Sequence, residues 1–123
     1  MKLRSLVGHR ADIVGPETPV VDVARIMLDR DVAAVAVVDR TGLVGICTER
    51  DLARSLAEGC DDDTVVDDVM TSSPDTVGPD VDIADAASWM LETGYRHLPV
   101  VEDGELLGIV DVRDVLWALI DTD

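Results

Sequence analysis

The stretch that decides the fold is Gly-Ile-Cys-Thr-Glu-Arg-Asp at Gly45–Asp51, because the chain contains it twice. It returns as Gly-Ile-Val-Asp-Val-Arg-Asp at Gly108–Asp114, an offset of 108 − 45 = 63 residues. The same offset, without gaps, aligns Val14-Gly15-Pro16 with Val77-Gly78-Pro79, Asp22 with Asp85, Ala24 with Ala87, Met27-Leu28 with Met90-Leu91, and Val37-Val38 with Val100-Val101. Such self-similarity indicates an internal duplication. We assign residues 1–60 to a first repeat and 61–123 to a second, with an acidic linker at Glu58–Asp63.

Each repeat predicts the same order of elements, β-α-β-β-α, which is an α/β (α+β) class of fold. The first helix has an apolar stripe at i, i+3, i+4 and i+7 spacing, at Val20, Val23, Ala24 and Met27 and again at Ile83, Ala86, Ala87 and Met90. Strands are expected at 13–14, 33–38 and 43–47 and at 76–77, 97–101 and 106–110, with a final helix starting near Thr48 or Asp111. A small sheet covered on one face is marginal alone. We therefore expect the repeats to pack sheet to sheet with pseudo-twofold symmetry, leaving ligand clefts between them.

The charge excludes one class of partner. The chain has 26 acidic and 10 basic residues, a formal net charge of -16, and Lys2 is its only lysine. Phosphate contacts dominate affinity for DNA and RNA, so nucleic-acid binding is not expected. A GC-rich genome would explain the Asp-rich composition, but we favour a halophilic source, where molar salt screens the self-repulsion. An apolar content of 47% argues against disorder.

Cysteine and hydropathy patterns favour a soluble protein of the cytoplasm. The only cysteines are Cys47 and Cys60, too few for a disulfide framework, and Cys47 lies in an apolar run typical of a buried strand. The N-terminus leads into no apolar stretch of signal-peptide length. The longest apolar run, Val32–Val38, is too short to span a bilayer, so no membrane partner is expected.

Three motifs, in order and partly duplicated, resemble those of the CBS-domain pair, or Bateman module. They are Val69-Met70-Thr71, Arg96-His97-Leu98-Pro99-Val100-Val101, and Gly45-x-x-Thr48-x-x-Asp51. The resemblance covers roughly Ser5 to Ile120. It implies a regulatory module that senses an adenosyl ligand (AMP, ADP, ATP or S-adenosylmethionine) in two clefts, requires no cofactor, and forms a homodimer of four repeats. With no effector domain in sight, such a module would act in trans on an unknown partner protein.

The Thr48–Asp51 motif has two compatible interpretations. Thr48 and Asp51 fit a capping box at the start of a helix, which needs no ligand. A helix N-terminus also attracts anions, and the resemblance implies that Asp51 accepts the ribose hydroxyls. The second repeat departs from the pattern, because Asp111 replaces the hydroxyl residue and would repel a phosphate. Asp114 could still hold a ribose. Because of the charge of Asp111 we expect the two sites to be unequal, with the Thr48/Asp51 site the stronger.

Arg96 and His97 are the second pair of candidates, at the entrance of a predicted strand where the first repeat has two alanines. They could be a surface arginine and a packed histidine, but we favour phosphate binding, with Arg96 as a forked donor. The resemblance further implies that Ile13, Val14, Thr76 and Val77 flank the adenine, although they could equally be an ordinary edge of the core.

Other functions and residues receive less weight. An enzyme is not expected, because a Gly-rich phosphate loop, a His-x-x-x-His pair and a Gly-x-Ser-x-Gly elbow are all missing from the sequence. CBS pairs occur as inserts in IMP dehydrogenase, but its catalytic barrel needs about 250 residues. A ligand-free dimerisation or interaction domain is the main alternative.

Several polar and aromatic residues are expected to have structural roles. Asp61–Asp63 indicates a solvated loop and no metal site, and Arg50 and Arg113 are expected to be solvated or paired with aspartates. His9 and Arg10 are assigned no role. Trp89 and Trp117 are either core residues or anchors of an interface.

Overall fold

The computed structural model describes residues 1–7 and 11–121, which fall into two compact units. The first unit comprises residues 11–74, and the second comprises residues 75–121 together with 1–7. His9 and Arg10 lie outside the described residues. Because the units are defined by packing and the repeats by sequence, the repeat boundaries at 1–60 and 61–123 stay a prediction.

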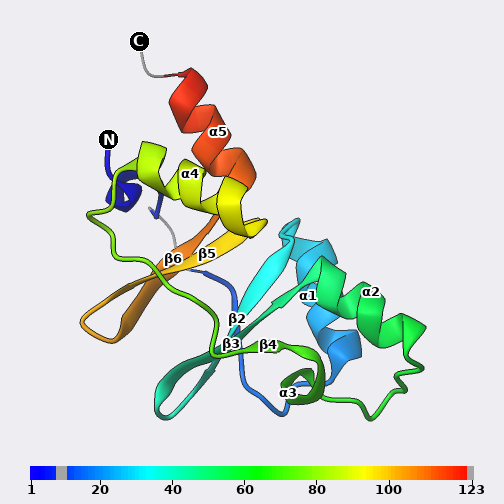
Figure 1. The fold of residues 1–123 in the computed structure, drawn as a ribbon. Helices are drawn as coiled ribbons and strands as arrows, with labels where there is room; N and C mark the ends of the chain where they lie inside the picture. The colour runs from blue at the N-terminus through cyan, green and yellow to red at the C-terminus, as the bar shows by residue number, and fades with distance from the viewer. Residues whose placement is uncertain (8–10, 122–123) are drawn as a thin grey trace. The chain divides into compact units, whose positions relative to one another are not determined.

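The first unit is a four-stranded sheet with two helices on one face (Figure 1). Its elements are β1 (Ile13–Val14), α1 (Val20–Arg30), β2 (Ala34–Asp39), β3 (Gly42–Thr48), α2 (Glu49–Ala57), α3 (Val66–Val69) and β4 (Thr71–Ser72). The order is β1-β2-β3-β4, with β1 parallel to β2 and the other pairs antiparallel. The apolar stripe of α1 packs through Val23 and Met27 onto Val35, Val37 and Cys47 of the sheet.

The second unit repeats this plan with fewer formal strands. Its elements are the 3₁₀ turn η1 (Leu3–Leu6), α4 (Ile83–Thr93), β5 (His97–Glu102), β6 (Glu105–Asp111) and α5 (Val112–Ile120). Val77 forms a parallel bridge with Val100, as Val14 does with Val37 in β1 and β2. The predicted element order and the mixed α+β class are therefore confirmed in both units.

The duplication extends to strand register. Ala34 pairs with Thr48 across β2 and β3, and His97, 63 residues on, pairs with Asp111 across β5 and β6. Both hairpins carry their irregularity at the same point, after Val37 and after Val100. Register is set where one face of a sheet is buried, so equal hydrophobic patterns in the two repeats produce equal ladders.

Each unit is completed by a short segment that the sequence did not predict. In the first unit, Val20 N–H donates to Thr64 O at 2.9 Å and Val66 N–H to Thr18 O at 2.8 Å. In the second unit, Ile83 N–H donates to Met1 O at 2.9 Å and Leu3 N–H to Val81 O at 3.0 Å. The two bonds of the second unit are the counterparts of the two in the first unit at the 63-residue offset. Leu3 and Val66, which are equivalent, are both fully buried. Residues 1–7 thus do for the second unit what residues 64–70 do for the first.

Candidate functional site

The Thr48–Asp51 motif forms the junction between β3 and α2. Thr48 is the N-cap of α2: its hydroxyl accepts from Asp51 N–H at 3.2 Å, while its own N–H donates to Asp51 Oδ2 at 3.0 Å. The predicted capping box is therefore confirmed. It holds the Asp51 carboxylate in the first turn of α2, where the macrodipole favours negative charge. The N–H groups of Glu49 and Asp51 in this turn already donate, to Ala33 O at 3.0 Å and to the Thr48 hydroxyl.

Asp51 is 3% exposed and fully engaged within the first unit. Besides Thr48, Arg54 donates from Nη1 to Oδ1 at 3.2 Å, and the Thr71 hydroxyl lies 3.3 Å from Oδ1 and 3.4 Å from Oδ2. Burial, with the Asp51 charge adding to it, raises the pKa of the neighbouring Cys47 thiol to about 12. Sequence reasoning missed Arg54 and Thr71, although the i, i+3 spacing of Asp51 and Arg54 was a usable signal.

The equivalent junction in the second unit has the same backbone and different side chains. Asp111 caps α5 by accepting from Asp114 N–H at 2.8 Å, and its N–H donates to Asp114 Oδ2 at 3.2 Å. Asp114 is exposed, and its Oδ1 accepts no hydrogen bond from the residues that the structure describes. The positions of Arg54 and Thr71 are taken by Trp117 and by Gly8, which lies outside the described residues. Asp51 and Asp114 therefore occupy equivalent backbone positions, but different side chains surround them.

The segments predicted to flank an adenine lie along the same sheets. Ile13 pairs with Ala36, and Thr48 pairs with Ala34, so both candidates border β2 from opposite sides. Two strand spacings and two residues of rise separate their backbones by roughly 12 Å. Val14 is buried, whereas Ile13 is 54% exposed and could contact a ligand.

In the second unit, Val77 N–H donates to Pro99 O at 3.0 Å and Val101 N–H to Val77 O at 2.9 Å. Neither bond uses the N–H or the carbonyl oxygen of Thr76, which is exposed. Thr76 therefore keeps backbone groups and a hydroxyl that a ligand could reach.

Arg96 and His97 lie at the end of the hairpin where α5 begins. The Arg96 carbonyl accepts from Val112 N–H at 2.8 Å, and half-buried His97 is paired in register with Asp111. The structure thus gathers Arg96, His97 and Asp114 at one end of the second unit. Thr48 and Asp51 belong to the first unit.

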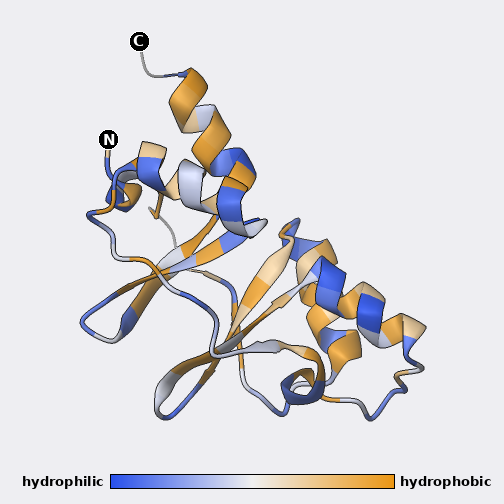
Figure 2. Ribbon diagram, in the orientation of Figure 1, coloured by the Kyte–Doolittle hydropathy of each residue, from blue (hydrophilic) through white to orange (hydrophobic). Residues whose placement is uncertain are grey.

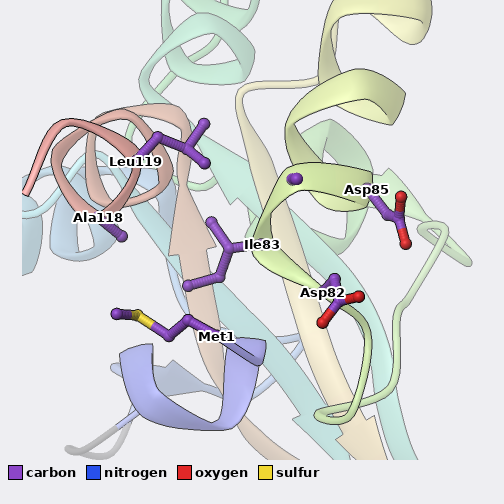
Figure 3. Close-up of a pocket in the computed structure, with 7 residues that line it drawn as sticks. Met1, Asp82, Ile83, Asp85, Ala118 and Leu119 are labelled. Atoms are coloured by element: carbon purple, nitrogen blue, oxygen red, sulfur yellow. The ribbon is translucent and has the colours of Figure 1, made fainter. Parts of the chain in front are cut away.

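A pocket of about 380 Å³ lies elsewhere in the second unit, at the start of α4. Figure 3 shows Met1, Ile83, Ala118 and Leu119 facing one another, with the carboxylates of Asp82 and Asp85 on the far side of the first turn of α4. None of the predicted site residues lines it. Asp82 is ion-paired with Lys2 at 3.0 Å, which lowers the Asp82 pKa. Since Asp82 and Asp85 are among the residues that line the pocket, it does not suit a phosphate.

The Asp61–Asp63 run is satisfied by its own loop. Asp61 Oδ1 accepts from Asp63 N–H at 2.9 Å and from the Thr64 hydroxyl at 3.2 Å. Within residues 1–7 and 11–121, no group of three or more His, Cys, Asp or Glu side chains could hold a metal ion. In the same part of the chain, no helix is long and apolar enough to cross a membrane.

The duplicated junctions match a known family. The CBS domain model matches residues 4–58 and again residues 66–121. The chain belongs to the CBS-domain family. An uncharacterised 17.7 kDa protein of Acidianus ambivalens is 34% identical over 122 residues, which is 98% of this chain and 74% of that protein.

Solved CBS structures have the same fold. A crystal structure of a CBS domain superposes with a TM-score of 0.92 at 30% identity over 98% of both chains. The CBS protein CBSX2, solved in complex with AMP, has a TM-score of 0.75 at 32% identity over 89% of this chain and 87% of that one. The inosine-5′-monophosphate dehydrogenase of Korarchaeum cryptofilum is 37% identical over 105 residues, but these are only 21% of that enzyme. That likeness is confined to the CBS part and carries no evidence of catalysis in this chain.

Proposed function

We propose that this CBS pair is a regulatory module that binds adenine nucleotides and acts in trans on a partner protein. The observation that carries the proposal is the Asp51 carboxylate, held by a capping box at the N-terminus of α2. The AMP complex of CBSX2, a relative at 32% identity, supports the choice of an adenosyl ligand. ADP, ATP and S-adenosylmethionine are the alternatives for the same site.

The proposed site residues divide into three groups. Asp51 and Asp114 take the ribose hydroxyls, because carboxylates accept two O–H donors. Thr48 and the basic pair Arg96 and His97 take phosphate oxygens, through a hydroxyl and through charge-assisted donors. The adenine lies against the short extended segments, which are Ile13, Val14, Thr76 and Val77.

Isothermal titration of the chain with AMP, ATP, S-adenosylmethionine and GMP, at low and at molar salt, tests the proposal. We expect heat with at least one adenosyl compound and none with GMP, whose charge equals that of AMP but whose base presents a different hydrogen-bonding edge. Asp51→Asn and Asp114→Asn should each remove or weaken one binding event. The absence of heat and of any thermal shift with every adenosyl compound would refute the proposal.

A homodimer is the second element of the proposed function, and the outer face of α4 and α5 supports it. Leu91, Trp117 and Ile120 on this face are 86%, 72% and 73% exposed. Figure 2 shows α5 as hydrophobic over most of its length. Large apolar side chains that are exposed to this degree support an interaction surface here. The position of Trp117 outside the core supports the anchor alternative for this residue, whereas Trp89 is partly buried against the core.

Sedimentation equilibrium tests the dimer and separates it from the ligand-free alternative. We expect a dimer for the unchanged chain and a monomer for Trp117→Arg, which introduces the residue type of the equivalent position 54. A monomeric chain at all concentrations would refute the dimer. A dimer that binds no adenosyl compound would favour a pure interaction domain. We place the protein in the cytoplasm, where its free cysteines Cys47 and Cys60 would stay reduced.

A further inference from the structure

We infer that Arg54 and Thr71 form a latch on Asp51, which must open before that carboxylate can hold a ribose. The inference rests on the proposed function and adds a regulation of the same site. It names two residues whose removal should tighten ligand binding.

The first step is to count the hydrogen bonds that the Asp51 carboxylate already accepts. A carboxylate has about four lone-pair positions for hydrogen bonds. Those of Asp51 are met by the Thr48 N–H at 3.0 Å, the Thr48 hydroxyl at 3.2 Å, Arg54 Nη1 at 3.2 Å and the Thr71 hydroxyl at 3.3 Å. Two ribose hydroxyls bring two further donors, so two of the present donors have to leave.

The second step is to identify which donors leave. The Thr48 N–H bond to Asp51 Oδ2 belongs to the capping box. The Thr48 hydroxyl is held beside Oδ2 by the other capping-box bond, which it accepts from Asp51 N–H, so both Thr48 donors are fixed by the start of α2. Arg54 has a side chain that is 55% exposed, and Thr71 lies on the exposed edge strand β4. Exposed partners are released cheaply because water replaces their hydrogen bonds. Arg54 and Thr71 are therefore the donors that yield to the ribose.

The second unit provides an internal comparison. Its Asp114 keeps only the capping-box bond, and Trp117 stands where the latch arginine would be. The Asp114 carboxylate is exposed, with Oδ1 bound by none of the described residues. The backbone junction thus does not itself require a latch, and the one on Asp51 is an added feature of the first unit.

The test is a titration of the full chain with adenosine and with AMP in an Asp114→Asn background, so that the heat reports on the Asp51 site. Arg54→Met keeps the aliphatic stem and removes the donor. Arg50→Met is the matched control, since Arg50 is an exposed arginine on the same helix whose side chain forms no hydrogen bond or ion pair with Asp51 among the described residues. Thr71→Val is the second variant, with circular dichroism to confirm its fold.

We expect Arg54→Met to lower the Kd for adenosine about two- to fivefold, the range of a half-exposed ion pair, and AMP to follow by a similar factor. Thr71→Val should act in the same direction, and Arg50→Met should change neither Kd. An unchanged or weaker affinity in Arg54→Met would overturn the latch, as would a loss confined to AMP, which would make Arg54 a phosphate ligand. If no variant binds adenosine or AMP, the proposed function itself has failed and the latch with it.

Discussion

Replacing Gly45 by alanine is expected to destabilise the first unit by about 1 kcal/mol, because the new methyl group would meet the side chain of Met70. A Cβ at this position would lie 2.3 Å from Met70 Sδ and 3.0 Å from its Cγ and Cε. Ordinary carbon contacts are about 3.5–4.0 Å, so the thioether has to move by more than an ångström. Overpacking of a core costs roughly 1–3 kcal/mol, and the low end applies here because Met70 is a flexible, partly buried side chain that can move. Urea unfolding of Gly45→Ala measures it.

Two glycines of the same chain serve as controls. A Cβ on Gly15 or on Gly78 would meet nothing within 4 Å, so Gly15→Ala and Gly78→Ala should change the free energy of unfolding by about 0.5 kcal/mol or less. A Gly45→Ala variant as stable as these two would refute the argument.

A double-mutant cycle then isolates the contact. Met70→Ala alone should cost about 2 kcal/mol, the low end for methionine-to-alanine changes, because Met70 is only partly buried. Added to Met70→Ala, Gly45→Ala should cost almost nothing, which gives a coupling of about 1 kcal/mol. Additive effects would show that the glycine is needed for a reason other than Met70. Because Met70 precedes Thr71, the cycle also reports on the strand that carries half of the latch.

Three further outcomes are expected. Asp31 and Gly94 are equivalent left-handed C-caps with φ of 53° and 79°. In urea unfolding, Asp31→Gly should therefore stabilise the chain by about 0.5–1 kcal/mol and Gly94→Ala should destabilise it by about 1 kcal/mol. Changes of the same sign in the two variants would contradict this. At pH 8, Ellman's reagent should modify Cys60 rapidly and Cys47 only on unfolding, because burial raises the Cys47 pKa to about 12, and simultaneous modification would contradict it. Raising KCl from 0.1 to 1 M should raise Tm, since the Debye length falls from about 10 to about 3 Å and the net charge is -16; an unchanged Tm would argue against the halophilic interpretation.

The sequence predicted the elements that local physics specifies. The stripe of Val20, Val23 and Met27 buries one face of α1, and the structure shows these residues in the core. The capping boxes could be predicted because the N-cap residue and its partner are only three residues apart, so both are recognised within one short stretch of sequence. Both hairpins followed from apolar runs separated by a turn.

The missed features depend on distant residues or on segments too short to show a period. Helix α3 has four residues, fewer than one hydrophobic repeat needs, and η1 is equally short. The Thr71–Asp51 bond joins residues 20 apart. The placement of Leu3 in the second unit could have been predicted only by extending the 63-residue offset to residues 1–7. These residues share no identity with residues 64–70, and only their backbone positions are equivalent.

The two capping boxes show why the repeats could diverge chemically while keeping one backbone. Thr and Asp cap a helix about equally well, so exchanging Thr48 for its counterpart Asp111 leaves the junction intact but changes its charge. The exchange of Arg54 for Trp117 removes the latch at the same time. Two opposing effects then set the order of affinity of the two sites. A phosphate is repelled at Asp111, whereas a ribose must displace Arg54 and Thr71 at Asp51. Adenosine has no phosphate, so only the cost of displacing Arg54 and Thr71 applies to it, and it should prefer the Asp114 site. Both effects apply to AMP. The preference of AMP for Asp51 predicted from the sequence therefore holds only if repulsion by Asp111 exceeds the cost of opening the latch.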